Sequence, residues 1–132
     1  AAINIIPSTS GASISVVESL PMLKGKLEGY ALRVPVIDGS ITSIIAKVKK
    51  KTNVEEINAE FKKQANGAMK GVLGFSDAPI VSQDIIHNSN SSIFDSGLTK
   101  VIEDLVSVAS WYDNEWGYSC RLVDVARLIE KL

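Results

Sequence analysis

The sequence WYDNEWGYS, residues 111–119, is the densest aromatic and polar run in the chain. It holds both tryptophans and two of the three tyrosines of a chain that is only 6% aromatic. An apolar run with a strand pattern precedes it, and an amphipathic run with a helix pattern follows it. We therefore interpret it as a strand-to-helix junction, where side chains can point outward from the end of a sheet.

Two residues of this junction suit ligand recognition. The carboxamide of Asn114 can both donate and accept hydrogen bonds, and Tyr118 offers a flat face with a polar tip. The stretch contains no obvious nucleophile, acid or base. The alternative is structural: Asp113 or Asn114 caps the final helix, and the aromatic side chains pack beneath it.

Composition and charge narrow the class of protein. With 132 residues, 45% apolar and 22% charged, the chain has the composition of one globular domain. A formal net charge of −1 provides no overall field to attract nucleic acid or an anionic membrane. The lone Cys120 fits a reducing compartment, and no apolar run approaches the roughly 18 residues that span a bilayer. We expect a cytoplasmic protein that binds neither nucleic acid nor membranes.

The first part of the chain predicts a helix start. Residues 1–7 are mostly apolar and end at a proline, and Ser8 to Gly11 then supply hydroxyls and a glycine before an apolar pattern with helical spacing. Free N–H groups at such a start can bind an anion, although any helix start has a similar composition.

The middle of the chain predicts strands. Residues 27–36 and 40–51 have strand patterns, and Asp38-Gly39 between them is a turn signal, so we predict an antiparallel hairpin. Further short strands are expected in residues 71–75, 80–87 and 91–94, with at least one more in residues 100–112.

Two further helices complete the pattern. Thr52 and Glu55 form a capping-box pattern before an amphipathic run, for which Gly67 is a plausible stop, and residues 115–132 predict a final helix. The order predicts an α+β fold with an antiparallel or mixed sheet, helices packed on one face and a long C-terminal helix. No repeat or linker divides the chain, which reads as one unit.

Several kinds of active site have no motif here. The chain has no G-x-G-x-x-G or Walker A pattern, and one cysteine and one histidine cannot form a zinc site without carboxylate ligands. Cys120 lies in the predicted last helix and His87 in a polar turn far from it in sequence, so we do not expect them to form a nucleophile–base pair. We predict no catalytic residue and no metal ligand in this chain.

Four ordered segments nevertheless resemble one enzyme family. They are AINIIPSTSG at 2–11, LRVPVIDGSIT at 32–42, SSIFDS at 91–96 and SWYDNEWGYS at 110–119, and they are similar to the C-terminal part of phosphorylating glyceraldehyde-3-phosphate dehydrogenases. The resemblance spans essentially the whole chain. It implies an enzyme that uses NAD and inorganic phosphate, is tetrameric when complete, and carries its Rossmann domain and catalytic Cys–His pair upstream of these residues.

The resemblance also assigns roles to five residues. Ser10 and Gly11 match the hydroxyl–glycine pair that binds the attacking phosphate, with serine where the family usually has threonine. Arg33 matches the arginine that contacts the substrate phosphate, Asn114 the residue that binds the nicotinamide carboxamide, and Tyr118 a tyrosine near that ring. Without the resemblance, Arg33 could equally be an exposed or salt-bridged strand arginine.

Two alternatives remain at this stage. One is the related erythrose-4-phosphate dehydrogenase, because the phosphate-contacting residues do not separate the two enzymes. The other is a catalytically inactive, stand-alone module that binds an anion or another protein. In either case we expect this polypeptide alone to be inactive as a dehydrogenase, and to associate with itself or with the missing half through exposed apolar surface.

Overall fold

The computed structural model describes residues 2–132, which separate into two compact units. One unit ends at Ile37 and the other runs from Asp38 to Leu132. The sequence pattern did not indicate this division. Each unit is described by itself.

The first unit consists of two short paired strands with a helix between them in sequence. It contains β1 (Ile6–Thr9), α1 (Ala12–Ser19), the 3₁₀ helix η1 (Pro21–Leu23) and β2 (Tyr30–Arg33). The strands β1 and β2 are antiparallel, with Ile6 opposite Arg33 and Thr9 opposite Tyr30. The predicted helix start after the Ser8–Gly11 segment is confirmed.

The second unit is built on a four-stranded mixed sheet. Its elements are β3 (Ser40–Lys47), α2 (Val54–Asn66), β4 (Leu73–Ser76), the 3₁₀ helix η2 (Ser82–Ile85), β5 (Ser92–Ile102), β6 (Leu105–Tyr112) and α3 (Trp116–Ile129). The strand order is β3-β6-β5-β4; β4 runs parallel to β5, and the other pairs are antiparallel. The predicted α+β class, with a mixed sheet and a C-terminal helix, is confirmed.

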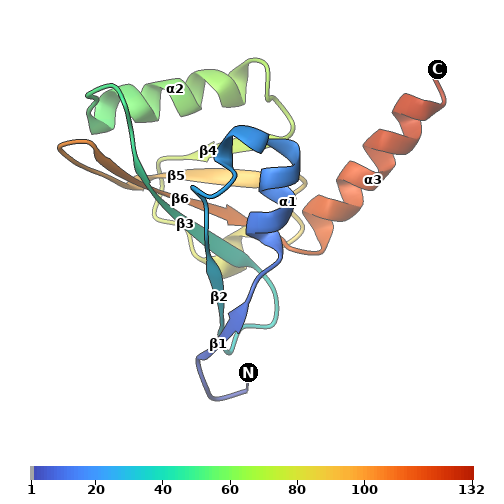
Figure 1. Cartoon of the computed structure of the whole chain (residues 1–132). Coiled ribbons are helices and arrows are strands. Elements are labelled where there is room, and N and C mark those ends of the chain that lie inside the picture. Colours follow the sequence, from blue (N-terminus) through green and yellow to red (C-terminus); the bar gives the residue numbers. More distant parts are fainter. Residues whose placement is uncertain (1) are drawn as a thin grey trace. The chain divides into compact units, whose positions relative to one another are not determined.

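The core of this unit lies between α2 and the sheet (Figure 1). The ring of Phe61 on α2 stacks on Phe94 of β5 with centroids 3.8 Å apart, and Phe94 is only 1% exposed. Asn58 of α2 adds polar contacts, because its Nδ2 donates to the Ser96 carbonyl (3.2 Å) and its Oδ1 accepts from Thr99 Oγ1 (2.7 Å). Aromatic stacking and paired polar groups thus fix α2 on β5.

The predicted hairpin between residues 27–36 and 40–51 is wrong. The strand β2 pairs with β1, and β3 pairs along its whole length with β6, from Ser40 opposite Tyr112 to Lys47 opposite Leu105. Residues 34–39 form bends that include Pro35, which has no N–H for a strand ladder. The Asp38-Gly39 signal does mark a change of backbone conformation, since Gly39 has a positive φ of +90°.

Two smaller predictions are also corrected. Residues 80–87 are not a strand, because the 3₁₀ helix η2 occupies Ser82–Ile85 within this segment. Asp84 Oδ2 accepts from the Val81 N–H at 2.8 Å, and Ile85 is buried in the second unit. The cap of α2 is Asn53 rather than Thr52, because Asn53 Oδ1 accepts from the Glu56 N–H at 2.8 Å. The predicted stop at Gly67 is confirmed.

The start of α3 is held close to the rest of its unit. A Cβ built on Gly117 would lie 3.0 Å from the Asn90 carbonyl oxygen, so any larger residue would require the neighbouring backbone to shift. One turn later, Arg121 Nη1 donates to the Gly71 carbonyl at 2.9 Å. The remainder of α3 extends away from the sheet (Figure 1), and Leu122 and Ile129 on it are more than half exposed.

Candidate functional site

The helix start of the first unit brings together a hydroxyl and a glycine. Ser10 Oγ accepts from the Ala12 N–H at 3.2 Å, which leaves the Ser10 hydroxyl proton able to donate outward. Gly11 has φ −77°, and a Cβ at this position would meet nothing within 4 Å. Neither backbone conformation nor packing therefore requires glycine here. Close approach of a ligand to the backbone is a remaining physical reason for it.

The side chain of Arg33 is exposed at the end of β2 and oriented by the neighbouring strand. Its Nε donates to Ser8 Oγ on β1 at 3.2 Å. Within residues 2–132, no ion pair and no further hydrogen bond occupies its two terminal nitrogens. A guanidinium held at Nε keeps the fork that binds tetrahedral anions through two parallel bonds.

The two features lie on one strand ladder but at different points of it. Arg33 is opposite Ile6, whereas Ser10 follows Thr9 at the other end of the pairing. The Arg33 guanidinium nevertheless reaches back along β1 to Ser8, two residues before Ser10.

The junction after β6 is organised by Asp113, which is only 2% exposed. Its Oδ1 accepts from the N–H groups of Glu115 (2.9 Å) and Trp116 (2.7 Å), and its Oδ2 accepts from the His87 N–H (2.8 Å). The structural alternative is therefore correct for Asp113, which holds the first turn of α3. This cap does not exclude a ligand role for the next residue.

Burial alone would raise the pKa of Asp113, because it disfavours the charged form. The hydrogen bonds from the Trp116, His87 and Glu115 N–H groups, together with the nearby His87 side chain, outweigh burial and hold the pKa below its usual value. Asp113 is thus ionised at neutral pH. A fixed negative charge at the start of α3 also favours the helix dipole.

Asn114 is exposed, with one end of its amide engaged. Ser40 Oγ, at the first residue of β3, donates to Asn114 Oδ1 at 3.0 Å. No hydrogen bond within residues 2–132 uses the Asn114 NH₂ group. Tyr118 lies four residues further along the chain on α3 and is 67% exposed. Both residues are therefore free to contact a ligand.

Cys120 and His87 do not form a hydrogen-bonded pair within residues 2–132. The His87 ring packs against Trp116 with centroids 5.1 Å apart, and Cys120 lies one turn further along α3. In the same described range, no cluster of three His, Cys, Asp or Glu side chains is arranged to hold a metal ion. No helix in this part of the chain is both long and apolar enough to cross a membrane.

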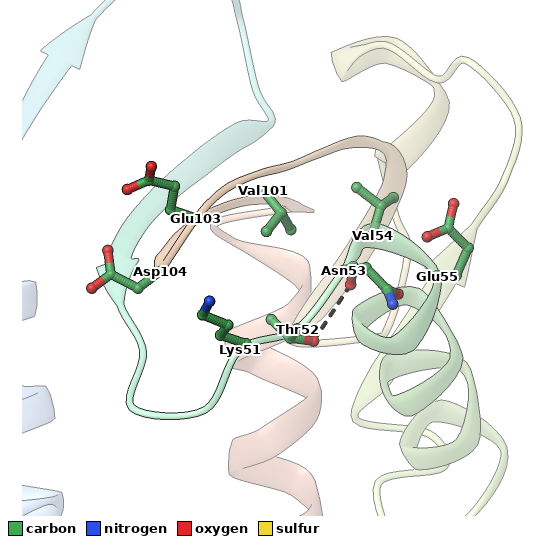
Figure 2. A pocket seen from close by; sticks show the side chains of 8 residues that line it. All are labelled: Lys51, Thr52, Asn53, Val54, Glu55, Val101, Glu103 and Asp104. Carbon is green, nitrogen blue, oxygen red and sulfur yellow. Dashed lines mark hydrogen bonds between the residues drawn. The ribbon is translucent and has the colours of Figure 1, made fainter.

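One hollow of the second unit is lined by residues at the start of α2 and at the β5–β6 turn. It has a volume of about 700 Å³ and opens between the start of α2 and the β5–β6 turn (Figure 2). Its charged lining residues are one cation, Lys51, and three carboxylates, Glu55, Glu103 and Asp104. The lining therefore has no excess of positive charge that would favour an anion. The Asn53 side chain already caps the helix end that faces it. The hollow contains none of the predicted ligand-binding residues.

Comparison with known proteins decides the family. A sequence model described as "Glyceraldehyde 3-phosphate dehydrogenase, C-terminal domain" matches residues 1–114. The chain belongs to this family. The resemblance inferred from the four segments is therefore confirmed, and the matched range contains Ser10, Gly11, Arg33 and Asn114, whereas Tyr118 lies beyond it.

Individual members of the family are similar along the whole chain. Glyceraldehyde-3-phosphate dehydrogenase of Mycobacterium avium is 57% identical over 131 residues, 99% of this chain and 39% of the relative. The Mycolicibacterium smegmatis enzyme of the same name is 53% identical, with 99% and 38% covered. Glyceraldehyde-3-phosphate dehydrogenase A, chloroplastic, of Chlamydomonas reinhardtii is 52% identical over 132 residues, with 99% and 35% covered. The chain thus spans about two fifths of the length of the curated relatives it matches.

Sequence reasoning missed one partner in the junction. The sequence pattern places Ser40 only at the start of a strand, whereas its contact with Asn114 depends on the pairing of β3 with β6. No local signal near Ser40 predicts this pairing, because the two residues are 74 positions apart. The cap by Asp113, in contrast, follows a local pattern and was anticipated.

Proposed function

We propose that this chain is the C-terminal part of the catalytic domain of a phosphorylating glyceraldehyde-3-phosphate dehydrogenase. The complete enzyme converts glyceraldehyde 3-phosphate, inorganic phosphate and NAD to 1,3-bisphosphoglycerate and NADH in glycolysis. The observation that carries the proposal is the family match over residues 1–114, which includes four of the five predicted binding residues. The Rossmann domain and the catalytic Cys–His pair belong to a segment outside residues 1–132.

The proposed phosphate roles agree with the chemistry of the first unit. Ser10 donates its hydroxyl proton to the attacking phosphate, and Gly11 allows that anion to approach the backbone at the start of α1. Arg33 binds the phosphate of the substrate through its terminal nitrogens, which are unpaired within residues 2–132.

The proposed dinucleotide roles agree with the chemistry of the junction. NAD supplies the hydride acceptor, and Asn114 binds its carboxamide through the amide end that carries no bond within residues 2–132. Tyr118 packs near the same ring. Holding the carboxamide fixes which face of the ring receives the hydride, and such orientation lowers the barrier without any acid or base from this chain. We propose NAD rather than NADP as the cofactor.

Exposed apolar surface supports a partner for the second unit. Leu122, Val125 and Ile129 follow one another at helical spacing on α3 and are 53%, 53% and 63% exposed. A contiguous apolar stripe of this kind is unusual on a free surface and is typical of an interface. We propose that the upstream half of the enzyme and other copies in a homotetramer cover such surface, and that the enzyme is cytoplasmic.

The test compares the 132-residue chain with the complete polypeptide made by its source. Formation of NADH or NADPH is followed by absorbance, with and without inorganic phosphate, using glyceraldehyde 3-phosphate or erythrose 4-phosphate as the substrate and NAD or NADP as the cofactor. We expect phosphate-dependent activity on glyceraldehyde 3-phosphate with NAD from the complete polypeptide, and none from residues 1–132 alone. Activity of the 132-residue chain, or a preference for erythrose 4-phosphate or NADP, would contradict the corresponding part of the proposal.

An intact mass of 14.2 kDa for the source protein would instead favour a stand-alone binding module.

A further inference from the structure

The contact between Ser40 and Asn114 joins two residues 74 positions apart in the sequence. Ser40 is the first residue of β3 and lies opposite Tyr112, the last residue of β6. Asn114 follows Tyr112 by two residues, so the sheet pairing brings the serine hydroxyl to the base of the junction. The Oγ of Ser40 donates to Asn114 Oδ1 at 3.0 Å.

Both ends of this contact stand on a fixed backbone. On one side, the carboxylate of Asp113, the residue before Asn114, accepts from the N–H groups of Glu115 and Trp116, which follow Asn114, and from the N–H of His87. On the other side, Gly39 precedes Ser40, and its backbone packs so closely that a Cβ built on Gly39 would lie 3.0 Å from the Ser82 carbonyl oxygen.

With its backbone fixed, the exposed amide of Asn114 retains freedom mainly in its side-chain torsions. An amide of this kind can present either its oxygen or its NH₂ group to a ligand. Ser40 occupies the oxygen and leaves the NH₂ group as the free end, so it selects one orientation before any ligand binds. Selecting the binding orientation in advance reduces the entropy lost on binding.

We infer that Ser40 is a positioning residue for the nicotinamide carboxamide, acting through Asn114. The inference rests on the proposed role of Asn114 and deepens it. Ser40 does not contact the cofactor; its hydroxyl presents the Asn114 NH₂ group as a donor to the carbonyl oxygen of the carboxamide. The inference predicts that the Ser40 hydroxyl affects binding of the nicotinamide end of the cofactor and leaves binding of the ADP-ribose end unchanged.

The test uses the complete polypeptide and two variants of equal shape, Ser40→Val and Ser40→Thr. Dissociation constants for NAD and for ADP-ribose, which lacks the nicotinamide ring, are measured by isothermal titration calorimetry. Loss of one oriented hydrogen bond should raise Kd for NAD about three- to tenfold in Ser40→Val. Ser40→Thr retains the hydroxyl and should bind NAD as the unmodified protein does, and Kd for ADP-ribose should be unchanged in both variants.

Three outcomes would overturn the inference. Equal Kd values for NAD in Ser40→Val and Ser40→Thr would show that the hydroxyl is irrelevant. A parallel loss of ADP-ribose binding in Ser40→Val would show a general structural defect instead of positioning. The third outcome requires the variant Asn114→Ala. If Asn114→Ala weakens NAD binding relative to ADP-ribose binding and Ser40→Val does not, only the role of Ser40 is wrong. If Asn114→Ala leaves that ratio unchanged, the proposed role of Asn114 fails as well.

Discussion

Replacing Asp113 by alanine should release the first turn of α3 from the rest of the second unit. The carboxylate accepts three backbone hydrogen bonds of 2.7–2.9 Å and is only 2% exposed. Loss of a helix cap costs about 1–2 kcal/mol, and leaving the His87 N–H without its acceptor costs about 1–2 kcal/mol more. We therefore expect the local opening free energy to fall by about 2–4 kcal/mol in Asp113→Ala.

The measurement is hydrogen–deuterium exchange at the His87 and Trp116 amides. A loss of about 2–4 kcal/mol corresponds to exchange that is faster by about 30- to 1,000-fold. Asp95→Ala serves as the matched control, because this carboxylate is also buried and accepts from the Gly97 N–H and from Trp111 Nε1. It should accelerate exchange at Gly97 and leave His87 unchanged. An unchanged rate at His87 in Asp113→Ala would refute the assignment of Asp113 as the anchor.

The same contacts predict how the junction depends on pH. Because the folded pKa of Asp113 is lowered, its contribution to stability is fully present above the unfolded value of about 3.9 and is lost as pH falls through the folded pKa. Protection of the His87 and Trp116 amides, corrected for intrinsic exchange, should therefore be constant near neutral pH and fall only in strong acid. Asp113→Asn should remove this acid transition. A transition that persists in Asp113→Asn would assign it to another group.

Four further substitutions test packing and binding separately. Gly39→Ala, with its positive φ and crowded surroundings, should lower the free energy of unfolding by about 2–4 kcal/mol, whereas Gly71→Ala, with a positive φ but open space, should cost only about 1 kcal/mol. Equal urea midpoints for these two variants would contradict the packing argument. Gly117→Ala should destabilise by about 1–3 kcal/mol although alanine has the higher helix propensity; a raised midpoint would show that the contact with Asn90 yields readily. In the complete enzyme, Arg33→Lys should raise KM for the phosphorylated aldehyde about tenfold by removing bidentate binding, and steady-state kinetics with an unchanged KM would exclude the proposed phosphate contact.

Strand pairing shows where the sequence pattern was insufficient. The alternation in residues 40–51 predicted a strand correctly, but the adjacent Asp38-Gly39 signal suggested a local partner, whereas the partner is β6 more than fifty residues later in the chain. Hydrophobic alternation indicates which side chains share a face, and many strands can satisfy the same alternation. Residues 80–87 failed for a related reason. Their apolar content reflects the burial of Ile85 within a short 3₁₀ helix, and the Asp84 side chain bonds the backbone locally.

Features that depend on local chemistry or on motif identity could be predicted from the amino-acid sequence. The glycine and hydroxyls before α1, the helix stop at Gly67 and the carboxylate cap at residue 113 act through neighbours a few positions away, so their effects can be read from spacing. The four motif segments likewise indicated the dehydrogenase family that the comparison then confirmed. The pairing of the strands, and hence the contact of Ser40 with Asn114 across 74 positions, could be seen only in the folded chain. Long-range pairing is decided by the combined burial and hydrogen bonding of the whole sheet, and no short stretch of sequence contains that information.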